Sequence, residues 1–340
     1  MFKKLGVVLL SLSLAVSLAG CGKGQTEVNT KAAASDNGKT GSEENWKPDR
    51  DFTIRVPSAA GDTMDTISRI VAQGLQSTYG KNAVISNIPG ASGAVAATDL
   101  LSADPNPGEM MTAGIAFFSI APLFNSEIKS NIDDYRFICG LTSENFILCV
   151  RADSGIKDLN DLIEYGKNGH LVFGGSAAGG AIHMLATSLF GQAGVDFETV
   201  TAESAAGHML NLASGQVDCA MATVNSCVQF IEEGSVIPIL VFDNDPYEDF
   251  DGFSVPTAKS YGYDIVYQSC NFLLTRAEVD QKVVDDIYQS ILAYAETEDF
   301  KKTAETANYI PDLISGEEVK QIVTDSRDFC TDIYNNYYKQ

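Results

Sequence analysis

Residues 52–75 read FTIRVPSAAGDTMDTISRIVAQGL, and this stretch carries the pattern that decides the fold. Residues 52–57 alternate between apolar and polar side chains, which is typical of a strand. A turn of small residues follows at Ser58–Thr63. Apolar residues then recur at helical spacing from Met64 to Leu75. The stretch therefore predicts a strand, a loop and a helix in that order.

The same unit recurs along the chain. Further strands are expected at 83–86, 110–115, 135–141, 146–151, 171–173, 218–222, 237–242 and 267–274. Helices are expected at 94–101, 116–124, 159–166, 181–191, 207–214, 227–233 and 317–337. Alternating strands and helices predict an α/β fold with largely parallel sheets.

The number of these units exceeds one compact sheet, so two lobes are expected, with the chain crossing between them more than once. Residues 46–147 are assigned to the first lobe, 148–269 to the second, and 270–340 to the C-terminal helices that fold back onto the first. Residues 146–153 and 267–274 are the candidate hinge strands. A chain of 340 residues is long enough for this organisation.

The N-terminus has the features of a targeting segment. Lys3 and Lys4 precede an apolar run, and small residues stand just before Cys21. This resembles a bacterial lipoprotein signal, which implies removal of residues 1–20 and an extracytoplasmic chain anchored to the membrane by lipid at Cys21. The alternative is a plain secretory peptide in which Cys21 is incidental. Residues 21–45 lack large apolar side chains apart from Val28 and predict a flexible tether.

The chain is strongly acidic. It has 23 Lys and Arg against 45 Asp and Glu, which gives a formal net charge of −22. Loss of residues 1–20, with their two lysines, makes the mature chain more acidic still. Nucleic acid and anionic lipid surfaces would be repelled by such a chain, so neither is expected as a partner. A small anionic ligand is not excluded, because backbone N–H groups bind anions without a net positive charge.

Six cysteines remain besides Cys21, namely Cys139, Cys149, Cys219, Cys227, Cys270 and Cys330. An even number in an extracytoplasmic protein allows up to three disulfides. Buried free thiols are the alternative, because Cys packs well as a small apolar residue. Several of the six lie in apolar strand-like runs and no CxxC pair occurs, so mostly free thiols are favoured.

The motifs of common enzyme classes are missing. There is no GxGxxG after a strand and no GxxxxGK[ST], and residues 174–178 fail the GxSxG pattern at the last position. The three histidines, His170, His183 and His208, lack metal-ligand spacing. The sequence thus predicts no catalytic residue, no metal site, no cofactor and no enzyme.

Two small-residue loops stand where a strand leads into a helix, at 58–63 and 174–180. In open α/β sheets ligands bind at the carboxyl ends of strands, where helix N-termini attract anions. Small side chains also allow the backbone to approach a ligand closely. The alternative is that Gly and Ala merely form tight turns.

Several short motifs, in order, resemble the extracytoplasmic solute receptors of tripartite tricarboxylate transporters, the TctC/Bug family. The resemblance extends from residue 46 to about residue 337. The matching residues are Pro57, Ala59, Ala60, Gly61, Asp65 and Arg69; Asn87, Pro89, Gly90, Ala91 and Gly93; Gly174, Gly179 and His183; Gly215, Gln216, Val217 and Asp218; and Val255, Pro256 and Thr257.

The resemblance implies a two-lobed, type II-like periplasmic-binding-protein fold that closes on a small carboxylate in the cleft between its lobes. It also implies delivery of that ligand to a separate membrane permease, and a monomer. The ligand-binding residues expected on this basis are Ser58, Ala60, Gly61, Asp62, Thr63, Asp65, Ile115, Ala116, Gly175, Ser176, Gly179, His183, Glu203, Ser204, Asn225 and Ser226.

The chain departs from the family at Asp62, where the family has glycine, and at Glu203 in the second lobe. If either carboxylate faces the cleft, a bare tricarboxylate is disfavoured, and an amino-acid-like ligand or a metal-chelated acid gains an ion pair. The alternative is that Asp62 caps the helix that follows it.

Two other functions stay open. The same fold could sense a ligand for a membrane signalling partner, and neighbouring permease or kinase genes would discriminate the two. The chain could also be an extracytoplasmic enzyme, and a ligand found intact in the cleft would count against that.

Overall fold

The computed structural model describes residues 46–202, 204–248, 250, 254–307 and 309–339. They belong to one compact unit, Asn45–Gln340. The predicted signal, Cys21 and the tether lie outside the described residues. Among the described helices, none combines the length and apolar character that crossing a membrane would take.

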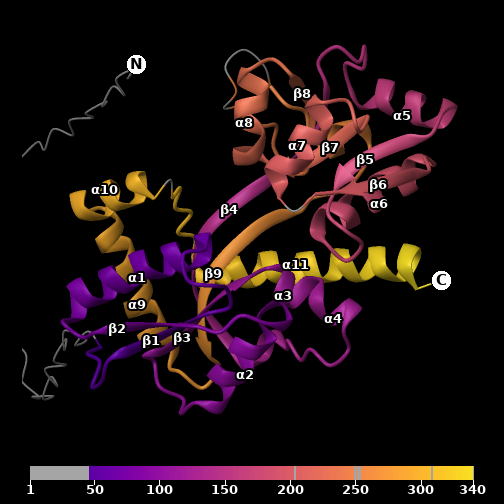
Figure 1. Cartoon of the computed structure of the whole chain (residues 1–340). Coiled ribbons are helices and arrows are strands. Elements are labelled where there is room, and N and C mark those ends of the chain that lie inside the picture. Colours follow the sequence, from indigo (N-terminus) through magenta and orange to yellow (C-terminus); the bar gives the residue numbers. More distant parts are fainter. Residues whose placement is uncertain (1–45, 203, 249, 251–253, 308, 340) are drawn as a thin grey trace, which may run out of the picture. The chain divides into compact units, whose positions relative to one another are not determined.

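Lobe 1 is built on the strands β1 (Phe52–Val56), β2 (Ala83–Asn87), β3 (Glu109–Gly114) and β9 (Gln268–Arg276), together with the first part of β4 (Tyr135–Arg151). Their order in the sheet is β2-β1-β3-β9-β4 (Figure 1). β1 is parallel to β2 and β3, whereas β9 is antiparallel to both β3 and β4.

Lobe 2 continues from the second part of β4. β7 (Cys219–Thr223) pairs with β4, and β5 (Leu171–Gly175) and β6 (Phe197–Thr201) follow in the order β4-β7-β5-β6. β8 (Val236–Val241) also pairs with β4. The carboxyl ends of β5, β6 and β7 share one edge because these strands are parallel.

β4 joins the two lobes as one continuous strand of 17 residues. It pairs with β9 as far as Asn145 and with β7 and β8 from Phe146 onward. The prediction of two separate strands at 135–141 and 146–151 is therefore wrong. Residues 142–145 are polar and half-buried, so the apolar sequence pattern is interrupted there although the strand continues.

The parallel pairing that the sequence predicted is found only between strands other than β4 and β9. Four strand pairs are parallel, and the four that involve β4 or β9 are antiparallel. The sequence pattern also missed β6, because its residues FETVT are only half-buried or exposed and lack a continuous apolar run.

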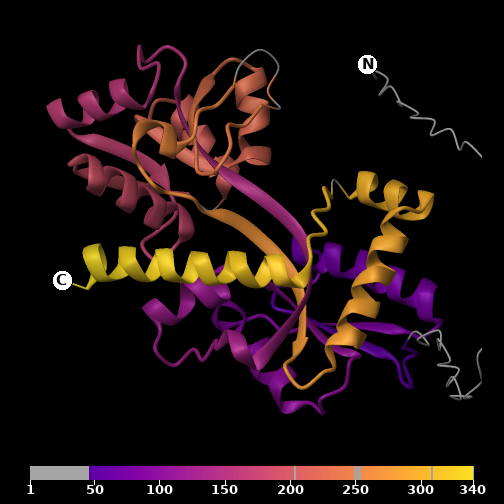
Figure 2. The same ribbon diagram turned by 180° about the vertical axis from the view of Figure 1, so that it is seen from behind.

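Helices cover both lobes (Figures 1 and 2). In lobe 1, α1 (Thr63–Tyr79), α9 (Gln281–Ala295) and α10 (Glu298–Thr306) share one apolar core, and α2 (Ala94–Ser102), α3 (Ala116–Ser119) and α11 (Gly316–Ile333) share another. In lobe 2 the helices are α5 (Leu159–Asn168), α6 (Ala181–Ala193), α7 (Ala205–Ala213) and α8 (Val224–Glu232). The single helix expected at 116–124 is two short ones, α3 and α4 (Ala121–Phe124), because Pro122 starts a new first turn.

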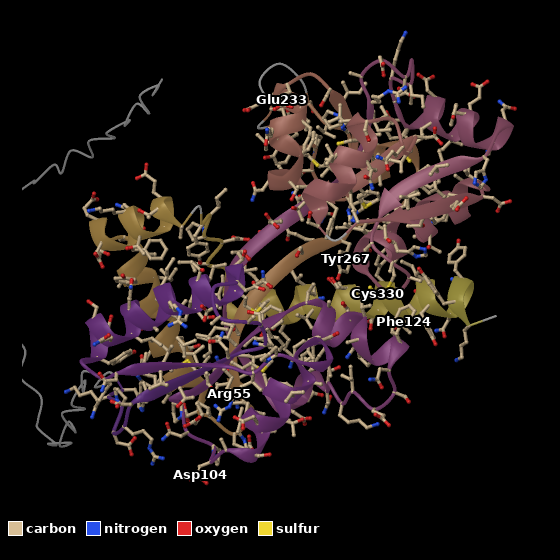
Figure 3. All side chains as sticks on the ribbon, in the orientation of Figure 1. Arg55, Asp104, Phe124, Glu233, Tyr267 and Cys330 are labelled. Carbon is tan, nitrogen blue, oxygen red and sulfur yellow. The ribbon has the colours of Figure 1, made fainter. Side chains whose placement is uncertain are left out.

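The C-terminal helix touches both lobes. α11 packs on α3 and β4 of lobe 1 and on α6 of lobe 2, and it continues as a π-helical turn at Tyr334–Tyr338. The Tyr338 hydroxyl oxygen lies 2.5 Å from Nδ1 of His183 in α6. The ring of Phe124 meets those of Tyr334 and Tyr338 edge-on. Figure 3 shows Phe124 close to Cys330 of α11, with Tyr267 nearby.

The segment from Asp312 to Gly316 lies along the edge of β4 in lobe 1. Gly140 N–H donates to the Ile314 carbonyl at 2.9 Å, and Asp312 N–H donates to the Leu141 carbonyl at 3.0 Å. Gly140 and Gly316 leave no room for a side chain, because a Cβ on Gly316 would lie 1.9 Å from the Phe137 carbonyl oxygen. The two glycines therefore allow this close backbone contact.

All six cysteines of the body are buried free thiols. This confirms the prediction of mostly free thiols over the disulfide alternative. Burial raises the pKa of the Cys270 and Cys330 thiols to about 12, so both are uncharged at neutral pH.

Candidate functional site

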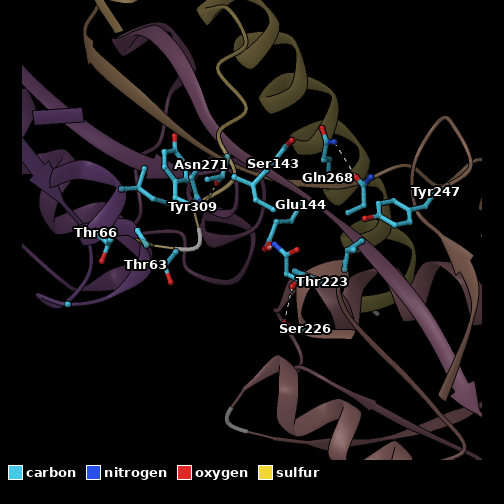
Figure 4. Close-up of a pocket in the computed structure, with 18 residues that line it drawn as sticks. Thr63, Thr66, Ser143, Glu144, Thr223, Ser226, Tyr247, Gln268, Asn271 and Tyr309 are labelled. Carbon is cyan, nitrogen blue, oxygen red and sulfur yellow. Dashed lines mark hydrogen bonds between the residues drawn. The ribbon is translucent and has the colours of Figure 1, made fainter. Parts of the chain in front are cut away.

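The largest described cavity lies where β4 and β9 pass between the lobes (Figure 4). Its volume is about 610 Å³, a size typical of small-molecule sites. Both lobes contribute to its lining, which consists of Gly61, Thr63, Thr66, Ile67, Thr142, Ser143, Glu144, Asn145, Thr223, Val224, Asn225, Ser226, Tyr247, Gln268, Asn271, Ala307, Tyr309 and Ile310.

The two crossing strands supply polar side chains that hold one another in place. Asn271 Nδ2 donates to Thr142 Oγ1 at 3.0 Å, and Gln268 Nε2 donates to Asn145 Oδ1 at 3.2 Å. Asn145 Nδ2 in turn donates to Asp243 at 2.7 Å. These hydrogen bonds fix the orientation of the amides, so the cavity presents a preorganised set of donors and acceptors.

The lobe 2 wall is the N-terminus of α8. Its N-cap residue is Thr223, whose side chain makes no capping hydrogen bond to the helix backbone. The Thr223 and Ser226 hydroxyl oxygens lie 3.1 Å apart instead. The first-turn N–H groups of α8 thus keep their capacity to bind an anion, which the partial positive charge of a helix N-terminus favours.

The lobe 1 wall is the N-terminus of α1. Asp62 is the N-cap, and its side chain accepts from the Met64 N–H at 3.1 Å. The alternative stated above for Asp62, a helix cap, is the arrangement in the structure. Asp62 is exposed and is not among the residues that line the cavity.

Asp65 fixes the loop that precedes α1. Its carboxylate accepts from Gly61 N–H at 2.8 Å, from Asn87 Nδ2 at 2.9 Å and from Arg69 Nε at 2.9 Å. Burial alone would raise the pKa of this carboxyl group, but these hydrogen bonds outweigh it and lower the pKa to about 2. The charged form is therefore the one that holds Gly61 at the cavity.

We expect Asp65→Asn to lower the free energy of unfolding by about 2 kcal/mol at pH 7. Because the folded pKa lies below the unfolded value, the contribution of Asp65 is present above about pH 4 and is lost as the pH falls toward 2. Urea unfolding at a series of pH values measures this. The variant should lose less stability than the wild type over that range. Asp62→Asn is the control, because Asn caps a helix as well as Asp. Equal stability of Asp65→Asn and this control would contradict the assignment.

Glu144 is the one carboxylate among the described lining residues, and that lining contains no Lys or Arg. Its Oε1 accepts from Asn225 Nδ2 at 2.6 Å, which connects β4 to the N-terminus of α8. Figure 4 shows Glu144 between the α1 residues Thr63 and Thr66 and the lobe 2 residues Thr223 and Ser226. Of the two carboxylates in the sequence hypothesis, Asp62 does not line the cavity, and Glu203 lies outside the described residues. Glu144, which the hypothesis did not name, does line it.

The other site residues expected from the sequence are distributed unevenly. Gly61, Thr63, Asn225 and Ser226 line the cavity. Ala116 and Gly179 line a second cavity of about 290 Å³, next to Ala91, Ser92 and Phe124. The lining of neither cavity includes Ser58, Ala60, Asp62, Asp65, Ile115, Gly175, Ser176, His183 or Ser204.

Several of these residues have local structural contacts. Ser176 Oγ accepts from His183 N–H at 3.2 Å in the first turn of α6. Ser204 caps α7 by accepting from Gly207 N–H at 3.1 Å. Burial lowers the pKa of His183, which keeps its imidazole neutral at pH 7. The Ser58 hydroxyl is shielded from solvent and has no hydrogen-bond partner among the described residues.

Sequence reasoning missed the residues of the crossing strands. Thr142–Asn145, Gln268 and Asn271 line the cavity, as do Tyr247 and the segment around Tyr309. The available signal was the run of four polar residues inside a long apolar strand pattern at 142–145. Within the described ranges, no three His, Cys, Asp or Glu side chains are grouped so that they could hold a metal ion.

The sequence is similar to one known protein family and to several individual proteins. Residues 67–333 match the model of the tripartite tricarboxylate transporter family receptor. A UPF0065 protein of Agrobacterium vitis, encoded in the TAR-I ttuE-ttuC' intergenic region, is 30% identical over 185 residues, which span 54% of each chain. A UPF0065 protein of Cupriavidus necator, encoded in the gbd 5' region, is 24% identical over 265 residues, or 77% of each chain. The match thus spans about half the length of the first relative.

Solved structures share the fold. A TctC solute binding protein from Polaromonas superposes with a TM-score of 0.77 at 20% identity, covering 85% of this chain and 99% of that one. MatC from Rhodopseudomonas palustris, solved with bound malate, has a TM-score of 0.62 at 20% identity and covers 84% of this chain and 99% of that one. Rpa4515 of R. palustris, solved with adipate, has a TM-score of 0.65 at 19% identity and covers 85% and 97%.

The two-lobed fold is therefore that of periplasmic solute-binding proteins, and the family is one of receptors rather than enzymes. The chain belongs to the tripartite tricarboxylate transporter receptor family.

Proposed function

We propose that this protein is an extracytoplasmic solute receptor that captures a small carboxylate in the cavity between its lobes. The observation that carries the proposal is the cavity itself, with the uncapped N-terminus of α8 on one side and the anchored loop before α1 on the other. A ligand that contacts both lobes favours the closed arrangement by its differential affinity for it.

A carboxylate is the class of ligand that fits. The two R. palustris neighbours were solved with malate and adipate, both dicarboxylates. In this chain, the first-turn N–H groups of α8 and the hydroxyls of Thr223 and Ser226 are donors suited to a carboxylate. The negative net charge of the chain does not exclude a carboxylate ligand, because a helix N-terminus binds an anion through the backbone N–H groups next to it.

The receptor passes its ligand to the membrane permease of a tripartite transporter and acts as a monomer held at the membrane by lipid on Cys21. The proposed lobe boundaries are 46–147, 148–269 and 270–340. The change of partner strands along β4 after Asn145 and the start of β9 at Gln268 support them.

Calorimetric titration with a panel of C3 to C6 mono-, di- and tricarboxylates and acidic amino acids tests the function. At least one compound is expected to bind with a Kd in the micromolar range and to be recovered unchanged. If no compound binds with a Kd below about 1 mM, the proposal of a carboxylate receptor is contradicted. Conversion of the bound compound would favour an enzyme, and a kinase gene beside the receptor gene would favour a sensor.

A further inference from the structure

We infer that the ligand carries an ammonium group next to its carboxylate, as an α-amino acid does, and that Glu144 is the residue that selects it. This inference rests on the proposed function and names the ligand class of the same cavity. Its basis is the position of one carboxylate and one uncapped helix N-terminus within a single polar cavity.

The negative side of the cavity is Glu144. Its side chain is half-buried, and its one hydrogen bond to a described residue comes from Asn225. Two further carboxylates do not line the cavity but accept hydrogen bonds from residues that do. Asn145 donates to Asp243, and Ser143 donates to Asp312. None of these three carboxylates forms an ion pair with any described residue. The field in this part of the cavity therefore favours a cationic group over a second carboxylate.

The positive side is the start of α8, where the Thr223 side chain leaves the first-turn N–H groups uncapped. The hydroxyls of Thr223 and Ser226 stand beside them and add two donors. A ligand carboxylate placed here is neutralised by fixed dipoles rather than by a side-chain cation.

The two sides are adjacent. Asn225 belongs to the first turn of α8, and its amide donates to Glu144 at 2.6 Å. A ligand that contacts both must carry its charges close together. An α-amino acid has its ammonium and carboxylate on the same carbon, so it can bind Glu144 and α8 at once. A dicarboxylate of equal length would set its second charge against Glu144.

The test is a comparison of amino acids with the same acids lacking the amine. The pairs are glutamate and glutarate, aspartate and succinate, leucine and 4-methylpentanoate, and alanine and propionate. Calorimetry measures each pair with the wild type, with Glu144→Gln and with the control Glu127→Gln, whose exposed side chain lies outside the cavity. Gln keeps an oxygen that accepts from Asn225, so the wall stays intact while the charge is lost.

In at least one pair, the amino acid is expected to bind the wild type about 10- to 100-fold more tightly than its partner, the range for a charged hydrogen bond. Glu144→Gln should remove that preference and Glu127→Gln should keep it. Carboxylates that bind with no preference for the amine would overturn the inference and leave the proposed function standing. A preference that survives in Glu144→Gln would overturn it as well. If no compound of any pair binds, the inference fails, and the wider carboxylate panel described above decides whether the proposed function fails with it.

Discussion

Replacement of Thr63 with tryptophan is expected to weaken ligand binding by about 100-fold or more. Thr63 is the first residue of α1, its side chain is exposed, and it lines the cavity between the lobes. An indole at this position would fill part of the cavity in which the proposed ligand binds (Figure 4). The helix should tolerate the substitution, because the side chain at this first position is exposed and does not pack in the core. Calorimetric titration with the carboxylate that binds the wild type most tightly measures the loss.

Thr78→Trp is the matched control for this variant. Thr78 lies near the other end of the same helix, is exposed, and does not line the cavity. It should keep the affinity of the wild type within about twofold, with the same thermal stability as Thr63→Trp. Equal binding by Thr63→Trp and Thr78→Trp would mean that the ligand binds elsewhere.

The second large effect concerns stability. Gly316→Ala is expected to lower the free energy of unfolding by about 3 kcal/mol, at the upper end for overpacking. The added Cβ would lie 1.9 Å from the Phe137 carbonyl oxygen and 3.2 Å from that of Ile138, and both atoms are backbone. A flexible side chain could move aside, but here β4 or the start of α11 must shift.

Urea unfolding of Gly316→Ala and Gly169→Ala measures this effect. At Gly169 the added Cβ would be 3.6 Å from the Tyr165 carbonyl oxygen, which is ordinary contact. The Gly169 variant should unfold at nearly the wild-type urea concentration. Equal midpoints for the two variants would show that residues 312–316 do not lie against β4 in solution.

Local patterns predicted much of the fold. The alternation at Phe52–Val56 and the helical spacing from Met64 to Leu75 describe β1 and α1 closely, because each has one face buried in the core. The pattern failed at residues 142–145, where β4 leaves one lobe and enters the other. Those side chains face a cavity rather than a core, so they are polar although the backbone stays in the sheet.

The site was harder to predict than the fold. Gly61 and Thr63 could be recognised because they lie where the chain passes from β1 into α1, and ligands of α/β proteins bind at such edges. Glu144 could not be recognised, since its place in the cavity depends on the packing of β4 against α8 of the other lobe. Asp62 resembled a cleft residue in the sequence, yet local geometry turns its carboxylate toward the Met64 N–H. Contacts between segments that are far apart in the sequence determine which carboxylate lines the cavity. Such contacts cannot be read from a single sequence.

The most direct test of the account is the identity of what the protein carries. The wild type and Thr63→Trp are purified under native conditions from the same cells, each is unfolded, and the released small molecules are identified by mass spectrometry. The account predicts a compound with a carboxylate group, at about one molecule per chain, from the wild type and not from Thr63→Trp. Release of the same compound in equal amounts from both proteins, or of no carboxylate from either, would contradict capture in the cavity between the lobes.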